Sequence, residues 1–164
     1  LKDCLLSDSE NWEGLITESI NIKNNIVLND PFEKGERKLL NFGHTIGHAV
    51  ESYSLLHDQN PLLHGEAIAI GMICESYISN SENELTASEL KNITTVLGEL
   101  YLPYKLDESS YHNYIELMKN DKKNERTGIN FTLLSKIGEA SFNKEVDVEL
   151  ILESLNYYNS LKRD

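Results

Sequence analysis

The stretch RKLLNFGHTIGHAVE, residues 37–51, is the most informative part of this chain. In a helix of 3.6 residues per turn, its polar members would share the face that a core-facing helix normally gives to apolar side chains. Removing such a row from water is costly unless a metal or a ligand compensates it. The stretch therefore predicts the wall of a binding site on a helix from about residue 36 to 54, lined by Arg37, Asn41, His44, His48 and Glu51.

Composition and charge limit the classes of protein. The chain has 164 residues, 40% of them apolar, which suits one globular domain with a core. A formal charge of −12 argues against nucleic-acid and membrane partners, because polyanions are bound by clustered Lys and Arg. No signal peptide or spanning segment is visible, so we expect a cytoplasmic protein. Cys4 and Cys74 stand far apart, which is typical of free reduced thiols.

Hydrophobic periodicity predicts a mainly α fold with one small β-hairpin. Thr86 and Glu89 have the spacing of a capping box. Two short apolar runs, 129–134 and 140–142, flank a turn at Ile137-Gly138 and predict the hairpin. Besides the helix over 36–54, helices are expected from residue 9 or 10 to 28, from 64 to 77 or 79, from 86 to 101, from 107 or 109 to 120, and from 148 to 162, with a loop over 79–83.

The histidines have the spacing of metal ligands. His44 and His48 are four residues apart, so one helix can offer both imidazoles to one metal, and His64 at the start of the next helix is placed for a third contact. The HExxH motif of zinc proteases is absent, since Thr45 stands where its glutamate would be. Two helical histidines alone are more often surface or core groups. The other polar residues of the 37–51 stretch make a metal site more plausible than two helical histidines alone would.

Neighbouring residues add detail to this prediction. Gly43 and Gly47 each cost ~1 kcal/mol inside a helix relative to Ala, which indicates that another element or a ligand approaches the backbone closely. Glu51 is expected to orient a histidine from behind, and Glu66 to act structurally in the first turn of its helix.

Several Lys and Arg residues of this acidic chain predict an anion-binding pocket, provided that the fold brings them together beside the histidines. Taken singly, each is an ordinary surface charge. The cations in question are Lys23, Arg37, Lys122 and Lys123, whereas His57 and His112 are expected at the surface without a role.

These patterns together resemble the 3-dehydroquinate synthase family. The resemblance is carried by residues 37–51, by HGEAIAIGM at 64–72, by the 23–37 segment with its Asp-Pro-x-x-x-Gly-x-Arg pattern, and by 121–138. It implies a multi-helix C-terminal domain of the dehydroquinate synthase-like type over residues 1–164. The N-terminal NAD-binding α/β domain of such enzymes is expected to be absent from this chain.

The resemblance also implies an activity. Such enzymes are lyases that convert 3-deoxy-D-arabino-heptulosonate 7-phosphate to 3-dehydroquinate and phosphate, in the shikimate pathway towards chorismate and the aromatic amino acids. They use NAD and a divalent metal, Zn2+ or another such as Co2+, on a small-molecule sugar phosphate, and a homodimer is compatible with the family. This chain alone is expected to be inactive, because it lacks the NAD domain and one metal ligand.

Site residues follow from the resemblance position by position. His44 and His64 match two metal ligands, and the third, a glutamate of an Ala-Glu-x-x-Lys motif, is expected two positions before Leu1. His48 matches a substrate-contacting histidine suited to proton handling. The matched catalytic positions are His48, Lys23, Arg37 and Asn41, and the matched substrate-binding positions are these four with Lys2 and one of Lys122 and Lys123.

Three alternatives stay open at this point. Another sugar-phosphate cyclase of the same scaffold, such as a synthase making an inosose or a valiolone, would use the same cofactors on a different substrate. A metal-dependent alcohol dehydrogenase also offers histidines to a metal from a helical domain, although the 37–51 pattern favours the synthase. A non-catalytic helical module that binds a metal or a partner would lack anion affinity.

Overall fold

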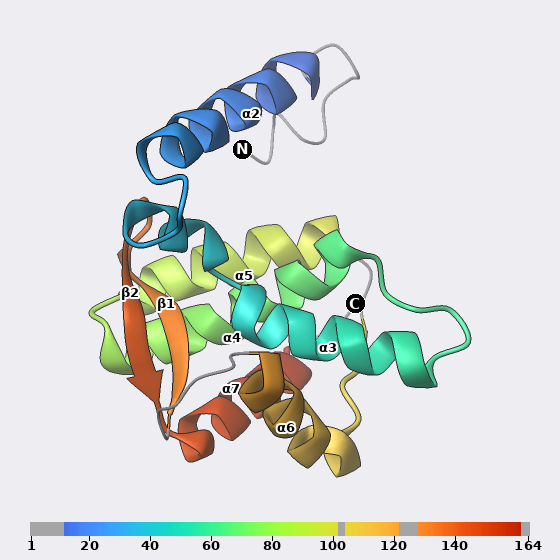
Figure 1. Ribbon diagram of the computed structural model, residues 1–164. Coiled ribbons are helices and arrows are strands. Elements are labelled where there is room, and N and C mark those ends of the chain that lie inside the picture. The colour runs from blue at the N-terminus through green and yellow to red at the C-terminus, as the bar shows by residue number, and fades with distance from the viewer. Residues whose placement is uncertain (1–11, 102–103, 122–127, 162–164) are drawn as a thin grey trace. The chain divides into compact units, whose positions relative to one another are not determined.

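The computed structural model describes residues 12–101, 104–121 and 128–161, and the chain divides into two compact units (Figure 1). The first unit, Leu1–Leu40, holds helix α2 (Trp12–Asn29) and the start of the 3-10 helix η2 (Glu36–Asn41). Helix α2 ends just before Asp30-Pro31, as predicted, because the residue before a proline disfavours the helical conformation.

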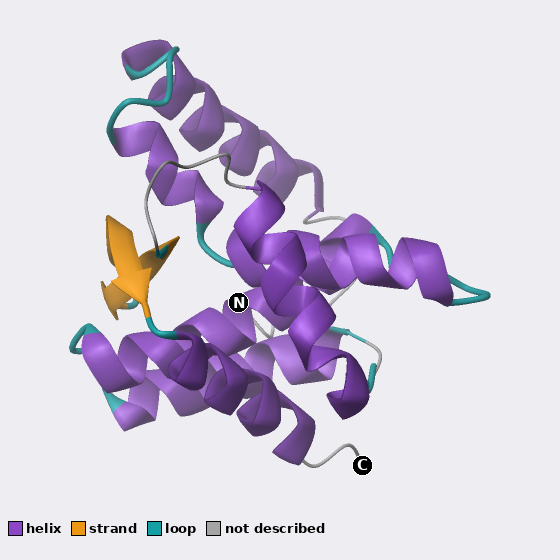
Figure 2. Ribbon diagram, turned by 60° about the horizontal axis from the view of Figure 1, so that its bottom comes forward, coloured by secondary structure: helices purple, strands orange, loops and turns teal. Residues whose placement is uncertain are grey.

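The second unit, Asn41–Asp164, is a helical domain with a two-stranded sheet. Figure 2 shows helices forming most of its described residues, with the two strands together at one side. The mainly α prediction with one hairpin is therefore confirmed. Its elements in chain order are α3 (His44–His57), α4 (His64–Glu82), α5 (Ala87–Leu100), η3 (Glu108–Ser110), α6 (Tyr111–Asp121), β1 (Ile129–Lys136), β2 (Glu139–Val146) and α7 (Val148–Ser160).

Helix α4 is the centre of this second unit. It packs against α3, α5, α7 and β1, and buried residues occur along most of its length. A helix that is apolar on nearly all sides is stable only when other elements cover it, which explains this position. Burial also raises the pKa of the Cys74 thiol far above its ordinary value, so this cysteine is an unreactive core residue.

Helices α3 and α4 approach each other at glycines. A Cβ atom at Gly47 would lie 2.8 Å from Cδ1 of Ile68 and 3.1 Å from the carbonyl oxygen of Ala67. A Cβ atom at Gly71 would overlap the carbonyl oxygen of Gly43. The close approach predicted from Gly43 and Gly47 is confirmed, and the approaching element is α4.

Strands β1 and β2 form the predicted hairpin, which is longer than expected. The strands are antiparallel, with Ile129 opposite Val146 and Lys136 opposite Glu139. Gly138 in the turn has φ 91°, a conformation that glycine adopts without strain. Phe131 on β1 is fully buried, so the hairpin closes one side of the core.

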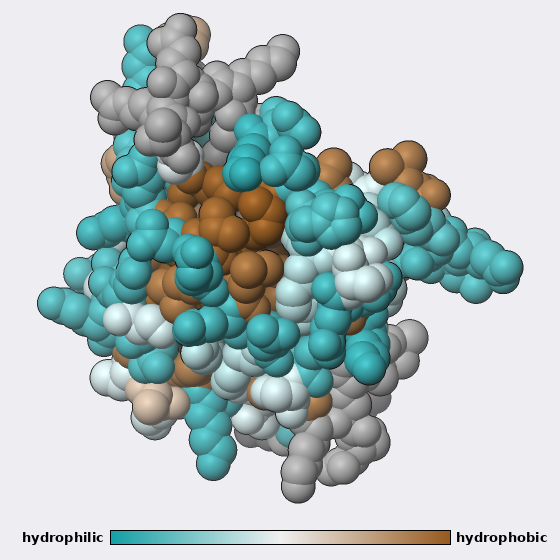
Figure 3. Space-filling model, turned by 90° about the horizontal axis from the view of Figure 1, so that it is seen from below, coloured by the Kyte–Doolittle hydropathy of each residue, from teal (hydrophilic) through white to brown (hydrophobic). Residues whose placement is uncertain are grey.

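The core of the second unit gathers residues from α3, α4, α6, α7 and the hairpin. Figure 3 shows that some apolar residues also reach the surface as a group on one face, next to hydrophilic residues. The largest fully buried apolar side chains are Tyr114, Phe131, Ile46, Ile78, Leu85, Leu106, Met118, Leu133, Ile151, Leu155 and Val50.

The prediction of a single helix over residues 36–54 is wrong. The structure has η2 up to Asn41 and starts α3 at His44, with Gly43 between them at φ 82°. This left-handed conformation cannot continue a helix, and glycine adopts it at little cost. Arg37 and Asn41 therefore do not share a helical face with His44 and His48.

The end of α4 differs from the boundary predicted from the sequence, whereas the start of α5 agrees with the prediction. The loop expected over 79–83 is mostly helical, because α4 continues to Glu82. The hydroxyl of Ser79 is satisfied inside the fold, since it donates to the carbonyl oxygen of Glu75 at 2.6 Å and accepts from the backbone of Leu134 at 3.0 Å. The capping box is confirmed: the Glu89 backbone donates to Oγ1 of Thr86, and the Thr86 backbone donates to the Glu89 carboxylate.

Filling the α3–α4 contact should destabilise the domain. We expect Gly71→Ala to lower the free energy of unfolding by about 1–3 kcal/mol, because the added methyl has to displace the backbone at Gly43. Urea unfolding followed by circular dichroism measures this change. Gly98→Ala in α5 is the matched control, because its Cβ meets nothing within 4 Å and should raise stability by up to ~1 kcal/mol. Equal effects of the two substitutions would contradict the close packing.

Candidate metal centre

Three imidazoles from two helices converge in the second unit. His44 is the first residue of α3, His48 lies one turn later, and His64 is the first residue of α4. One nitrogen from each ring lies within 4.8 Å of the others, and the ring centroids are 5.2–5.8 Å apart. His44 and His48 are half-buried and His64 is exposed, so the cluster is open to solvent. The cluster of His44, His48 and His64 is called the histidine triad below.

Hydrogen bonds at Nδ1 orient two of these rings. Nδ1 of His44 lies 3.1 Å from the carbonyl oxygen of Phe42, and Nδ1 of His64 lies 3.0 Å from Oε2 of Glu51. Both oxygens act as acceptors, so in a neutral ring Nδ1 carries the proton and Nε2 carries the lone pair that binds metals. The prediction that Glu51 orients a histidine is confirmed, and the histidine is His64.

A buried carboxylate holds the start of α3. Glu75 of α4 is fully buried, and its Oε2 accepts a hydrogen bond from the Gly43 backbone at 2.7 Å. Its Oε1 accepts from the backbone of Thr45 at 3.1 Å and of Ile46 at 3.2 Å. Glu75 is not among the site residues predicted from the sequence. The available indication was a single carboxylate inside the apolar run 67–78.

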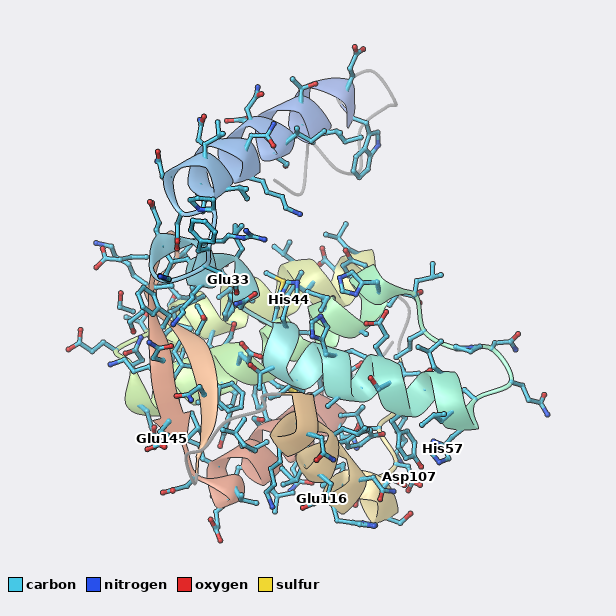
Figure 4. The ribbon with its side chains drawn as sticks, viewed as in Figure 1. Glu33, His44, His57, Asp107, Glu116 and Glu145 are labelled. Carbon is cyan, nitrogen blue, oxygen red and sulfur yellow. The ribbon has the colours of Figure 1, made fainter. Side chains whose placement is uncertain are left out.

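Other histidines and Glu66 behave as the sequence predicted. In Figure 4 the labelled His44 and His57 stand at opposite ends of α3. His57 is exposed and stacks on Tyr53 with 4.0 Å between ring centroids, and His112 is exposed on α6. The Glu66 carboxylate accepts from the Leu63 backbone at 2.7 Å, which is a structural role at the start of α4.

The remaining predicted site residues are not part of the triad. Asn41 is half-buried at the end of η2, and Lys23 is exposed on α2. Arg37 belongs to the first unit, where Nη1 donates to the carbonyl oxygen of Pro31 at 3.1 Å and Nε lies 3.9 Å from Glu33. Lys2, Lys122 and Lys123 lie outside the described residues.

The loop after α2 folds around the carboxylate of Asp30. Its oxygens accept from the backbone of Lys34 at 2.9 Å, of Gly35 at 2.7 Å and of Arg37 at 3.2 Å. These hydrogen bonds, the one from Lys34 foremost, hold the pKa of Asp30 below its ordinary value. The aspartate of the Asp-Pro-x-x-x-Gly-x-Arg pattern thus sets the backbone position of Arg37.

A helical domain that gathers three imidazoles from adjoining helices is a candidate metal-binding domain. Among the helices within the described ranges, none is both long and apolar enough to cross a bilayer. The sequence profile described as 3-dehydroquinate synthase C-terminal matches residues 1–124. The chain therefore belongs to the 3-dehydroquinate synthase C-terminal family.

Named relatives agree with this assignment. The chain is 44% identical over 145 residues to a 3-dehydroquinate synthase from Parabacteroides distasonis, covering 88% of this chain and 41% of the relative. It is 43% identical over 147 residues to that of Halalkalibacterium halodurans, covering 88% and 39%. The chain thus spans about two fifths of the length of these curated relatives.

A solved structure shares the fold. The chain superposes on a crystal structure of 2-deoxy-scyllo-inosose synthase with a TM-score of 0.70 and 29% identity, covering 88% of this chain and 40% of that chain. That synthase was crystallised with carbaglucose-6-phosphate, NAD+ and Co2+. The fold class predicted from the sequence is thereby confirmed.

The loop at Asp30 makes a pH-dependent prediction. We expect the pKa of the Asp30 carboxyl in the folded chain to lie below 3.8, and carbon-13 NMR of this carboxyl measures it. Because the ionised form accepts the hydrogen bonds, their stabilisation is present above the unfolded-state value and is lost as the pH falls through the folded pKa. The amide shifts of Gly35 and Arg37 should follow the same titration and lose it in Asp30→Asn. A pKa at or above 3.8 would contradict this structure of the loop.

Proposed function

We propose that this chain is the metal- and substrate-binding part of a 3-dehydroquinate synthase. The proposed reaction converts 3-deoxy-D-arabino-heptulosonate 7-phosphate to 3-dehydroquinate and phosphate in the shikimate pathway. Membership of the family supports the proposal, and the observation that carries it is the convergence of the histidine triad. The chain covers only part of its relatives, so an upstream NAD-binding domain is included in the proposal.

The donor set of the triad suits a divalent transition metal. Imidazole nitrogens are ligands of choice for Zn2+ and Co2+, and the triad offers three of them within 4.8 Å of one another. We assign His44 and His64 as the ligands from this chain, since hydrogen bonds at Nδ1 direct Nε2 of each ring towards metal binding. The proposed third ligand is the glutamate upstream of Leu1.

When bound, the metal supplies a Lewis acid that polarises a substrate oxygen, and NAD supplies a hydride acceptor that the reaction regenerates. NAD is proposed for the whole enzyme, and no residue of this chain is assigned to it. His48 is proposed to exchange a proton or a hydrogen bond with substrate, because a neutral imidazole can do both near pH 7. Its place beside His44 and His64 in the triad supports this role.

The anionic groups of the substrate need cationic and polar partners. Lys23, Arg37 and Asn41 are proposed for this role because they match the family motif, as do Lys2 and one of Lys122 and Lys123. Arginine suits carboxylate and phosphate groups because its planar guanidinium donates two parallel hydrogen bonds. Such contacts would hold the sugar phosphate in one orientation and so lower the entropic cost of reaction.

Metal binding distinguishes the two proposed ligands from His48. We expect His44→Ala and His64→Ala each to weaken Co2+ binding by more than the ~10- to 100-fold typical of losing an outer-sphere partner. His48→Ala should leave Co2+ affinity close to that of the unsubstituted chain. Calorimetric titration of the enzyme that includes the upstream domain, with circular dichroism to check folding, provides the measurement. An equal loss in all three variants would make His48 a third ligand.

Turnover tests the substrate assignment. We expect the enzyme that includes the upstream domain to release phosphate and form 3-dehydroquinate from the heptulosonate phosphate, while the 164-residue chain alone does neither. His48→Ala in that enzyme should lower kcat by about 100-fold or more, the usual contribution of a positioned acid or base. Product analysis by NMR with coupled phosphate detection measures both. Turnover by the isolated chain at the rate of the complete enzyme would refute the division of labour.

The similarity to 2-deoxy-scyllo-inosose synthase makes a related cyclase the second candidate. Glucose 6-phosphate, the counterpart of the carba-sugar in that crystal, is therefore the competing substrate to assay. Preferential cyclisation of glucose 6-phosphate would replace the synthase assignment, and Co2+ binding without turnover of any sugar phosphate would favour a metal-binding module. The coding sequence just before Leu1 is the simplest further check, because an in-frame Ala-Glu ending two residues upstream is expected.

A further inference from the structure

The Phe42–Gly43 peptide joins the buried carboxylate of Glu75 to the imidazole of His44. The Gly43 N–H donates to Oε2 of Glu75 at 2.7 Å. The Phe42 carbonyl oxygen, on the other side of the same planar peptide, lies 3.1 Å from Nδ1 of His44. Carboxylate, peptide and imidazole therefore form one hydrogen-bonded row within the second unit.

The chemistry of this row determines its direction. A carbonyl oxygen only accepts, so Nδ1 of His44 is the donor, which leaves the lone pair at Nε2. Hydrogen bonds in a row polarise each other, so the carboxylate strengthens the carbonyl as an acceptor. The row is shielded at its base, because Glu75 is fully buried and Gly43 is buried.

Glu75 also holds the backbone on both sides of His44. Its two oxygens accept from Gly43, Thr45 and Ile46, which supply the backbone donors at the start of α3. The N-cap residue, Gly43, has no side chain with which to cap the helix. The positive end of the helix dipole and these charge-assisted bonds compensate the burial of a carboxylate.

We propose that Glu75 is a positioning residue of the metal centre, which acts through the Phe42–Gly43 peptide to keep His44 protonated at Nδ1 with Nε2 presented to the ion. This inference rests on the proposed metal site and adds a residue that has no contact with metal or substrate. Glu51 has the matching task for His64, to which it bonds directly. The two carboxylates thus orient two different ligands independently.

Imidazole NMR of the metal-free 164-residue chain distinguishes a positioning role of Glu75 from a merely structural one, which would leave the tautomer of His44 unchanged. Long-range proton–nitrogen spectra at about pH 8, where imidazole is neutral, report the tautomer of each ring. In the unsubstituted chain we expect His44 and His64 both to be protonated at Nδ1. Glu75→Gln should give His44 a mixture of tautomers and leave His64 unchanged, whereas Glu51→Gln should do the reverse.

Metal affinity provides the second measurement. We expect Glu75→Gln to weaken Co2+ binding by ~10- to 100-fold and to change the visible absorption spectrum of the bound ion, as loss of an outer-sphere partner does. Ser79→Ala is the matched control. It removes a buried polar group one turn further along α4, whose hydroxyl bonds to the backbone of Glu75 and Leu134 rather than to α3. Ser79→Ala should leave the tautomers of His44 and His64 and the Co2+ spectrum unchanged, even if it lowers the stability of the fold.

The outcomes separate this inference from the proposed function. Glu75→Gln with unchanged His44 tautomer and Co2+ affinity would overturn the role of Glu75 and leave the metal site standing. Failure of the enzyme that includes the upstream domain to bind Co2+ would instead refute the metal site. If Glu75→Gln does not fold, the unsubstituted chain still decides, because a His44 protonated at Nε2 would contradict the row.

Discussion

The close crossing of α3 and α4 is the constraint on which the rest of the second unit depends. Glycines remove side-chain bulk where the helices meet, and the carboxylate of Glu75 crosses the contact to hold the first turn of α3. Packing is non-directional, but these hydrogen bonds fix both the distance and the rotation of α3. Because His44 and His48 lie on α3 and His64 begins α4, the crossing that stabilises the domain also brings the triad together.

Rigid elements give the triad its precision. Two rings are oriented by hydrogen bonds to groups behind them, one to a backbone carbonyl and one to a carboxylate. Such orientation in advance is what a preorganised site requires of its side chains. The exposure of His64 leaves one side of the cluster open to solvent.

Prediction from sequence succeeded where the determinant was local. Helical periodicity, the Thr86–Glu89 capping box and the Ile137-Gly138 turn all depend on residues close together in the chain, and the structure contains each of them. It failed at residues 36–54, because a periodic pattern cannot show that Gly43 adopts a left-handed conformation. The expected stripe of five polar residues is therefore shortened to its part on α3.

The amino-acid sequence by itself determined the family, the helical class and the three histidines, since long motifs and regular spacing are properties of the chain alone. Only the tertiary structure decided which groups orient those histidines. Glu51 and Glu75 are separated from their partners by 13 and 32 residues, and pairing over such distances is set by how helices pack. Burial has the same origin: Glu75 is an ordinary acidic residue in the sequence, and it becomes the helix cap because α3 covers it.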